Sequence, residues 1–223
     1  METPFLDRLG PQLQAVFLAA TTARAYDEGQ EVYRAGDPAD FLLLLGRGRV
    51  AMRVVSPGGR RATVQIHGPG SLVGELALVR RDPDARRPMT MLALEPVRSR
   101  VLTRDAFEQL CAQHPAVWDA VVDLVADRNV RLGRLLLEAM YDPLDRRVAA
   151  RLLELVDIYP PPAAGGSSVI RLTQGQIADV VGGTRPSVNQ VLQRLQREGL
   201  LELGRGRVTV ERPGDLRARL AAS

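Results

Sequence analysis

Residues 172–201 read LTQGQIADVVGGTRPSVNQVLQRLQREGLL, and the order of apolar, polar and glycine residues here predicts the structure of the C-terminal third of the chain. Thr173 stands three residues before Gln176, which is the capping-box pattern at the start of a helix. Apolar residues follow at helical spacing, so we expect a short helix over 174–181.

A second helix is expected across two glycines. Gly182-Gly183 end the first helix, and Thr184 is placed to cap a helix over 185–198 whose apolar residues form one face. Two helices across a tight glycine turn predict a helix-turn-helix, although an ordinary helical hairpin gives a similar pattern. The opposite face offers Arg, Asn and Gln, which match base edges in the major groove. Its polar residues are Arg185, Ser187, Asn189, Gln190, Gln193 and Arg194.

The next segment, ELGRGRVTVE at 202–211, reads as a β-hairpin with a Gly-Arg-Gly turn, as in a wing beside a helix-turn-helix. Arg205 and Arg207 are placed there to contact phosphates. The residues that we expect to contact DNA are Thr173, Gln174, Thr184, Arg185, Ser187, Asn189, Gln190, Arg194, Arg205 and Arg207.

The charge distribution also indicates that the C-terminal third of the chain binds a partner. The formal net charge is +4, and every basic residue is an arginine. Residues 1–142 carry 18 Arg and 18 acidic residues, whereas residues 143–223 carry 12 Arg and 8 acidic residues. A local basic excess predicts a polyanionic partner, although an arginine-rich solvated surface would give the same numbers.

Residues 115–141 read as one long helix that Pro115 begins and Asp142-Pro143 ends. Apolar residues spaced alternately four and three apart along this helix predict a coiled-coil seam. Its one polar member is Asn129, and a single asparagine at such a position fixes the register and the oligomeric state of a coiled coil. The seam consists of Trp118, Val122, Val125, Asn129, Leu132, Leu136 and Ala139. We expect a homodimer through this seam; a single helix packed on its own domain is the alternative.

A second apolar stripe on this helix is expected to face its own domain: Val117, Val121, Leu124 and Leu135. After it, Asp142 is expected to cap an amphipathic helix over 143–158, with Pro143 in the first turn.

Residues 1–113 read as mostly strands, with short helices over 4–20 and 103–111. Short aliphatic runs are separated by turn signals about ten residues apart, which predicts a small all-β roll, barrel or sandwich. The signals are Gly36-Asp37-Pro38, Gly46-Arg47-Gly48, Ser56-Pro57-Gly58-Gly59 and Gly68-Pro69-Gly70. The fold class is therefore α+β.

Composition argues against several classes of protein. The chain has 223 residues, of which 45% are hydrophobic and 25% charged, as is ordinary for a globular protein. Its apolar runs fall short of the roughly 20 residues that span a bilayer, so we expect no membrane partner and a cytoplasmic location. One cysteine, Cys111, predicts no disulfide and no zinc site within the chain. The sequence offers no nucleophile–base pair, phosphate loop or metal spacing, so we do not expect an enzyme.

The order of β-roll, long helix and winged helix-turn-helix resembles the bacterial transcription regulators of the cAMP-receptor/fumarate–nitrate-reductase-regulator (Crp/Fnr) superfamily. The resemblance rests on Gly36–Asp40, Gly70–Leu76 and Leu172–Leu201. It implies a homodimer on palindromic double-stranded DNA, an effector pocket between the roll and the long helix, and RNA polymerase as a partner. It also implies three parts: an effector-sensing β-roll domain (1–113), a dimerisation helix (114–141) and a winged helix-turn-helix DNA-binding domain (142–223).

The resemblance places an effector site at Gly74, Glu75, Leu76, Arg87, Pro88, Arg128 and Leu132. In cAMP-binding members a Gly-Glu-Leu run holds the ribose, and Gly74–Leu76 matches it. Their Arg-Ser or Arg-Thr pair binds the cyclic phosphate; Arg87-Pro88 keeps the guanidinium, but Pro88 lacks the hydroxyl and the backbone N–H. Leu132-Gly133 stands where those members place a Thr-Ser pair against adenine, and Arg128 keeps a basic residue one turn earlier.

These losses predict weak or absent cAMP binding, because each missing hydrogen bond is worth on the order of 1 kcal/mol. Leu132 on the seam could hold the helix pair without ligand, so we expect DNA binding that does not require cAMP. Another cyclic nucleotide remains open as the effector. The alternatives are that Glu75 and Arg87 form a structural ion pair in an empty pocket, that the regulator needs no effector, or that the chain is a cyclic-nucleotide-binding module acting on a protein partner.

Other residues separate this chain from relatives in the superfamily. Cyclic AMP receptors present Arg-Glu and a later Arg on the recognition helix, where this chain has Arg185-Pro186 and Gln190. We expect Arg185 to read guanine and Gln190 to favour adenine, and hence a related but different palindrome. The N-terminal cysteine cluster of redox-sensing members is absent from the sequence. His67 and His114 are expected to be surface or capping residues, and Cys111 a small core residue.

Overall fold

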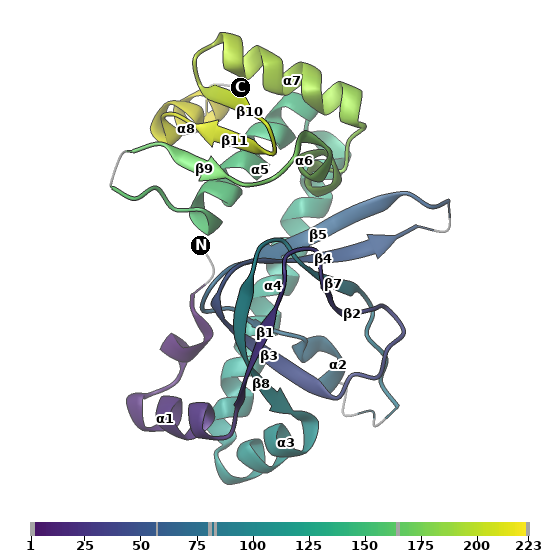
Figure 1. Cartoon of the computed structure of the whole chain (residues 1–223), viewed down its shortest axis with the longest axis vertical. Coiled ribbons are helices and arrows are strands. Elements are labelled where there is room, and N and C mark those ends of the chain that lie inside the picture. The colour runs from purple at the N-terminus through teal and green to yellow at the C-terminus, as the bar shows by residue number, and fades with distance from the viewer. Residues whose placement is uncertain (1–2, 57, 80–81, 83, 164–165, 222–223) are drawn as a thin grey trace. The chain divides into compact units, whose positions relative to one another are not determined.

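The computed structural model describes residues 3–56, 58–79, 82, 84–163 and 166–221 (Figure 1). Pro57, in one of the predicted turns, lies outside the described residues. Two compact units make up the chain: residues 3–54 with 64–132, and residues 55–63 with 133–221. No helix in these described ranges is long and apolar enough to cross a bilayer.

The first unit contains two four-stranded antiparallel sheets, as the β-rich reading of the sequence predicted. One sheet has the order β1-β8-β3-β6 and the other β2-β7-β4-β5. The strands are β1 (Thr22–Tyr26), β2 (Glu31–Tyr33), β3 (Phe41–Arg47), β4 (Val50–Val55), β5 (Arg61–His67), β6 (Leu72–Val73), β7 (Thr90–Ala93) and β8 (Val97–Thr103).

Strand β3, FLLLLGR, is buried on both faces and lies at the centre of this unit. Leu43 and Leu45 belong to the apolar core that β3 shares with strands of the second sheet. Leu42 and Leu44 face the other way, into a core completed by helices. A strand covered on both sides requires a continuous apolar run rather than alternation, which explains the four consecutive leucines.

The helices of the first unit are η1 (Phe5–Arg8), α1 (Pro11–Ala19), α2 (Glu75–Val79), α3 (Arg104–Gln113) and the start of α4 (Pro115–Tyr141). The single helix predicted over 4–20 is wrong. Gly10 adopts an extended conformation with ψ 158°, and Pro11 begins a new helix after it. The cap of α3 is confirmed, because the Thr103 hydroxyl accepts a hydrogen bond from the Ala106 N–H at 3.3 Å.

Three of the four residues predicted for the inner face of α4, Val117, Val121 and Leu124, are fully buried in the helix-covered core, while the fourth, Leu135, is half-buried. The placement of Trp118 in the seam is wrong: it packs against the edge of this same core, with its ring 6.2 Å from that of Phe107. The helix ends at Tyr141, as the following Asp-Pro pair indicated.

The second unit holds α5 (Leu144–Ile158), β9 (Ser168–Ile170), α6 (Gln174–Val181), α7 (Arg185–Arg197), β10 (Leu201–Gly204), β11 (Arg207–Val210) and α8 (Pro213–Ala221). The helix-turn-helix and the hairpin are confirmed. Strand β9, which adds a third strand beside β11, and helix α8 were not predicted. Helix α5 contacts α6, α7, α8 and β9, so it forms the centre of this unit (Figure 1).

The predicted cap of α5 is wrong. Pro143 takes the N-cap position with ψ 157°, so that the helix begins at Leu144. Asp142 is one residue too early to cap, and its backbone N–H still bonds to Glu138 at the end of α4. Its carboxylate instead accepts a hydrogen bond from Arg146 Nε at 3.2 Å.

Candidate functional site

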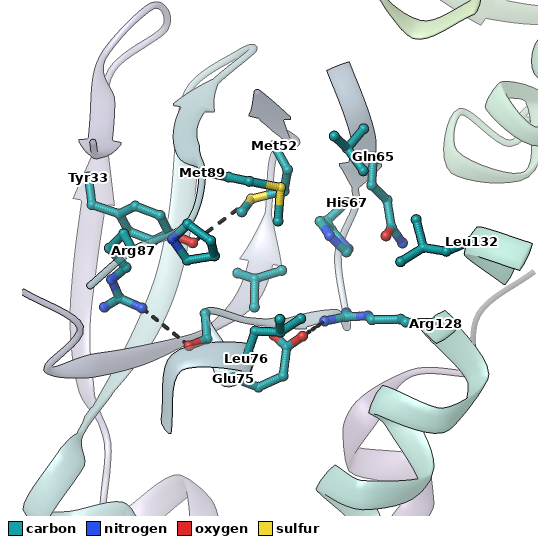
Figure 2. Close-up of a pocket in the computed structure, with 14 residues that line it drawn as sticks. Tyr33, Met52, Gln65, His67, Glu75, Leu76, Arg87, Met89, Arg128 and Leu132 are labelled. Atoms are coloured by element: carbon teal, nitrogen blue, oxygen red, sulfur yellow. Dashed lines mark hydrogen bonds and ion pairs between the residues drawn. The ribbon is translucent and has the colours of Figure 1, made fainter. Parts of the chain in front are cut away.

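A pocket in the first unit brings together every residue of the predicted effector site (Figure 2). Its free space, including the open mouth, is about 580 Å³, within the range of small-molecule sites. Half of the lining was not predicted from the sequence, because those residues lie in or directly beside strands that only the fold brings together. The missed residues are Tyr33, Met52, Val64, Gln65, His67, Val73 and Met89.

Arg87 is a buried cation at one end of the pocket, with only 2% of its surface exposed. Its Nη2 donates to the Phe41 carbonyl at 2.7 Å and its Nη1 to the Gly74 carbonyl at 3.2 Å. The guanidinium also stacks on the rings of Tyr33 and Phe41, 4.2 and 4.5 Å from their centroids. These contacts fix the charge in place, while the buried Nε has no hydrogen-bond partner among the described residues.

The charge on Arg87 is poorly compensated by neighbouring acids. Among the described residues the one carboxylate paired with Arg87 is that of Asp40, which is exposed and 3.9 Å away. Burial therefore lowers the pKa of the Arg87 guanidinium. A site with a buried, fixed cation of this kind suits an anionic ligand group.

Glu75 and Arg128 form a buried ion pair on the opposite side of the pocket. The Arg128 Nη1 lies 2.7 Å from the Glu75 carboxylate, and its Nη2 donates to the Leu72 carbonyl at 2.8 Å. The expected alternative, an ion pair between Glu75 and Arg87, is therefore wrong. Arg87 is held by backbone carbonyls instead, so it remains in the pocket as a separate cation.

The prediction that His67 is a surface or capping residue is also wrong. This residue ends strand β5, is 4% exposed and lines the pocket, so it is neither a surface nor a capping residue. Burial, reinforced by the nearby charges of Arg128 and Arg131, holds the pKa of His67 well below its usual 6.5. Its imidazole is therefore neutral near pH 7. His114, in contrast, occupies the C-cap of α3, and Cys111 packs against the core at its edge.

The remaining wall is largely apolar. Met52, Val64, Val73 and Met89 line the pocket, and burial raises the pKa of the Tyr33 hydroxyl above its usual range. Leu132 of α4 lines the mouth and is 44% exposed. The pocket thus offers one buried cation, one neutralised ion pair and an apolar surface.

The helix-turn-helix of the second unit is held by its own caps. The Thr173 hydroxyl accepts from Gln176 N–H at 3.2 Å, and the Gln176 side-chain oxygen accepts from Thr173 N–H at 2.8 Å, so the predicted capping box is confirmed. Thr184 likewise caps α7 by accepting from the Ser187 N–H at 3.3 Å. Gln174, the first residue of α6, is half-buried.

The turn between α6 and α7 requires both of its glycines. Gly182 has φ +71°, a conformation that favours glycine. A Cβ on Gly183 would lie 2.8 Å from Val188 and 3.1 Å from Leu144. This close packing fixes α7 against α6 and the start of α5.

Helix α7 separates an apolar face from a polar one. Val188, Val191, Leu192 and Leu195 are buried. The predicted reading residues Arg185, Gln190 and Arg194 are exposed, whereas Ser187 and Asn189 are half-buried. Within the described part of the chain, the exposed guanidinium groups of Arg185 and Arg194 have no ion-pair partner, which leaves them available to a ligand.

The wing carries two more exposed arginines. Strands β10 and β11 pair antiparallel through Gly204 and Arg207, with Gly206 at φ +71° in the turn. Arg205 and Arg207 are exposed at this tip. Exposed arginines on a polar helix face and at the tip of a hairpin suit the base edges and phosphates of a duplex.

The predicted seam of α4 is largely exposed. Val122 and Leu132 are each 44% exposed and Leu136 is 61% exposed. Asn129 is exposed as well, while Val125 is half-buried. Large apolar side chains left open at heptad spacing are typical of a helix that meets a partner helix.

Comparison with known proteins matches both units. Residues 23–114 match the cyclic nucleotide-binding domain family, and residues 146–219 match the Crp-like helix-turn-helix domain family. The CRP-like cAMP-activated global transcriptional regulator of Mycobacterium tuberculosis is 30% identical over 80% of this chain and 79% of its own length. The cyclic AMP receptor protein of Thermus thermophilus is 28% identical over 93% of this chain and 92% of its own.

A solved structure supports the fold. The c-di-GMP-responsive global regulator CLP of Xanthomonas campestris superimposes with a TM-score of 0.75 at 22% identity, covering 91% of this chain and 99% of that one.

Proposed function

Because this chain belongs to the Crp/Fnr superfamily of bacterial transcription regulators, we propose that it acts as a homodimer on a palindromic DNA site, with little or no dependence on cAMP. The proposal keeps the three expected parts: a sensing roll over 1–113, a dimerisation helix over 114–141 and a DNA-binding domain over 142–223. Contact with RNA polymerase and a cytoplasmic location belong to the same proposal.

The observation that carries the DNA-binding role is the polar face of α7. Arg185 and Arg194 are exposed there without ion-pair partners among the described residues, beside the exposed Gln190. Arg205 and Arg207 add two exposed arginines on the wing. Base contacts from α7 and phosphate contacts from the wing together account for the local excess of arginine.

The weak cAMP dependence rests on the pocket. Arg87 supplies a fixed cation for a cyclic phosphate, but both of its terminal nitrogens already donate to carbonyls. Glu75, the counterpart of the ribose-binding residue, is engaged by Arg128. Pro88 and Leu132 bring no hydroxyl to the ligand. Each missing hydrogen bond costs on the order of 1 kcal/mol, and about 1.4 kcal/mol is tenfold in affinity.

The direct test is selection of DNA from a random duplex pool by the purified full-length protein, followed by binding measurements with and without cAMP. We expect a palindrome, bound with equal affinity in both conditions, and no heat of cAMP binding by calorimetry up to millimolar ligand. Micromolar cAMP binding that tightens DNA binding would overturn the effector-independent part. Absence of any selected sequence would overturn DNA reading and favour a module that acts on a protein partner.

A pair of variants separates base reading from phosphate contact. Arg185→Ala should relax specificity at one position per half-site and cost about 1–3 kcal/mol on the selected palindrome. Arg205→Ala should instead weaken binding to all sequences alike and lower the salt dependence. An equal loss on every sequence for Arg185→Ala would make Arg185 a phosphate contact.

A further inference from the structure

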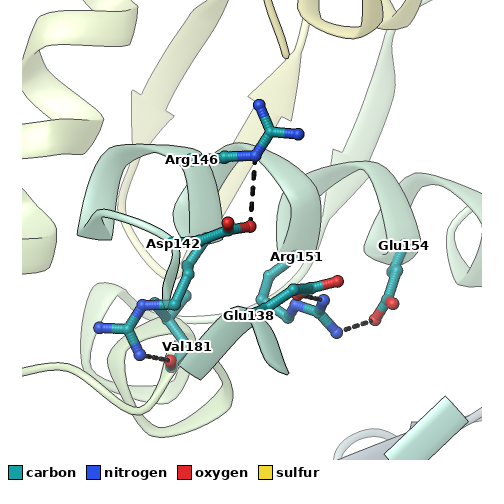
Figure 3. Close-up of polar contacts among 7 residues, drawn as sticks. Glu138, Asp142, Arg146, Arg151, Glu154 and Val181 are labelled. Atoms are coloured by element: carbon teal, nitrogen blue, oxygen red, sulfur yellow. Dashed lines mark hydrogen bonds and ion pairs between the residues drawn. The ribbon is translucent and has the colours of Figure 1, made fainter. Parts of the chain in front are cut away.

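The corner between α4 and α5 is held by a buried arginine. Arg151, on α5, is 5% exposed. Its guanidinium donates to the Glu138 carboxylate near the end of α4 and, at 2.7 Å, to the Glu154 carboxylate on α5 (Figure 3). The Glu138–Arg151 pair therefore joins two helices, whereas the Glu154–Arg151 pair lies within one.

Neighbouring arginines join α5 to the rest of its unit. Arg146 Nη1 donates to the Leu220 carbonyl at the end of α8 at 3.1 Å. Arg147 Nη1 donates to the Val181 carbonyl at the end of α6 at 3.5 Å, directly before the turn of the helix-turn-helix. Cationic groups at helix C-termini are stabilising, because the last carbonyls carry partial negative charge.

Through these contacts α5 supports the helix-turn-helix that contains α7. Gly183 lies so close to Leu144 that a Cβ there would be 3.1 Å from the leucine. The orientation of α5 therefore sets that of α6 and α7. Glu138 and Arg151, both in the same compact unit, link α5 to the last turns of α4.

We propose that Glu138 and Arg151 are positioning residues that set the half-site spacing of the DNA recognised by this protein. The inference rests on the proposed function, in which two copies pair along α4 and each reads DNA with α7. In such a dimer the angle between α4 and α5 decides how far apart the two α7 helices lie. Half-sites read by a symmetric dimer are about one helical turn apart, and their spacing follows from this geometry.

An ion pair suits this task better than apolar packing. Replacing a buried ion pair by apolar groups often costs little stability, whereas the pair itself demands one geometry. Arg151 has two carboxylate partners, so loss of Glu138 leaves its charge paired with Glu154. The corner would then lose its orientation without exposing an unpaired buried charge.

The test uses the full-length protein and the palindrome selected by the wild type, remade with the spacer between half-sites shortened or lengthened by one and two base pairs. Glu138→Gln removes the charge that holds the two helices together and leaves only a neutral acceptor, whereas Arg151→Met removes the link itself. Glu154→Gln removes a pair of the same kind within α5 and is the matched control. Dimer mass and thermal unfolding are measured for every variant, so that a folding defect is seen directly.

We expect the wild type and Glu154→Gln to prefer one spacer by about tenfold or more over its neighbours, as a rigid dimer requires. Glu138→Gln should bind the neighbouring spacers almost as well as the original, with its single-half-site affinity and dimer mass unchanged. Arg151→Met should lose the spacer preference in the same way if this variant folds. If Arg151→Met does not fold, the result for Glu138→Gln alone tests the inference. If Glu138→Gln keeps the spacer preference of the wild type, the inference is wrong and the proposed function stands. If the wild type selects no palindrome, the proposed function is wrong as well.

Discussion

Glu75 and Arg128 join the start of α2 to α4 within the first unit, far apart in sequence but 2.7 Å apart in space. Both side chains are less than a tenth exposed, so neither charge is solvated if its partner is lost. Glu75→Gln leaves the Arg128 charge buried with only a neutral acceptor. We expect a loss of about 3 kcal/mol in the free energy of unfolding, measured with denaturant.

A matched control for Glu75→Gln lies in the same unit. Glu108 is 60% exposed and 3.6 Å from Arg104, one helical turn away. Glu108→Gln should change the free energy of unfolding by less than about 1 kcal/mol, because exposed pairs contribute little. Equal losses in the two variants would show that burial does not distinguish the pairs.

His67 makes stability depend on pH. Because burial and the charges of Arg128 and Arg131 lower the pKa of His67 in the folded state, the unfolded chain binds its proton first as the pH falls below 6.5. The unfolded state is thereby favoured, and stability is lost on the acid side. Between about pH 7.5 and pH 5.5 the wild type should lose about 1.4 kcal/mol relative to His67→Gln.

The pH profile is measured by denaturant unfolding of the wild type, His67→Gln and His114→Gln. His114 lies at the C-cap of α3, and its substitution serves as the control for loss of a histidine. Parallel profiles for the wild type and His67→Gln would contradict a neutral, buried His67.

At the scale of single elements, the segments predicted correctly are those whose signals are local. Thr173 with Gln176, Thr184 with its glycine turn, and Thr103 before α3 cap helices within three or four residues, so the sequence displays them directly. The break at Gly10-Pro11 is also local, yet the apolar spacing across it continues and conceals it. The prediction that Asp142 caps α5 is wrong because Pro143 occupies the N-cap position.

The contacts of the pocket and of β9 depend on distant segments and could not be read from spacing. Strand β9 is only three residues long and is defined by pairing with β11, some forty residues later in the chain. The choice of Arg128 rather than Arg87 as partner of Glu75 depends on which face of α4 meets α2. The resemblance to a known family found seven lining residues of the pocket but not the strand residues opposite them.

Gly133 in α4 offers a test of helix propensity. It lies inside a continuous helix, and a Cβ placed on it meets nothing within 4 Å in the described chain. Gly133→Ala should therefore raise the free energy of unfolding by about 0.5–1 kcal/mol. Gly182→Ala should lower it, because φ +71° is strained for alanine.

Both glycine variants are compared with the wild type by thermal and denaturant unfolding of the full chain. Loss of stability in Gly133→Ala would show that a second chain fills the open space beside this residue, which lies next to the predicted seam. Such a result would contradict the propensity argument and would locate the dimer contact.

At the scale of the whole molecule, dimerisation is the property on which palindrome reading depends. Leu136 and Leu137 are adjacent on α4 and similarly exposed, at 61% and 58%. Leu136 lies on the heptad seam, whereas Leu137 lies about a quarter turn away from it. The two leucines therefore form a matched pair: they have similar exposure and differ in their position relative to the seam.

Leu136→Glu should place a charge in the seam of each chain and separate the dimer, because two like charges would meet in an apolar contact. Light scattering should then give the monomer mass of 24.4 kDa, and affinity for the palindrome should fall towards that for a single half-site. Leu137→Glu should keep the dimer mass and the palindrome affinity. If Leu137→Glu separates the chains and Leu136→Glu does not, the helices pair in another register, and the apolar residues that α4 leaves exposed outside the seam form the interface instead.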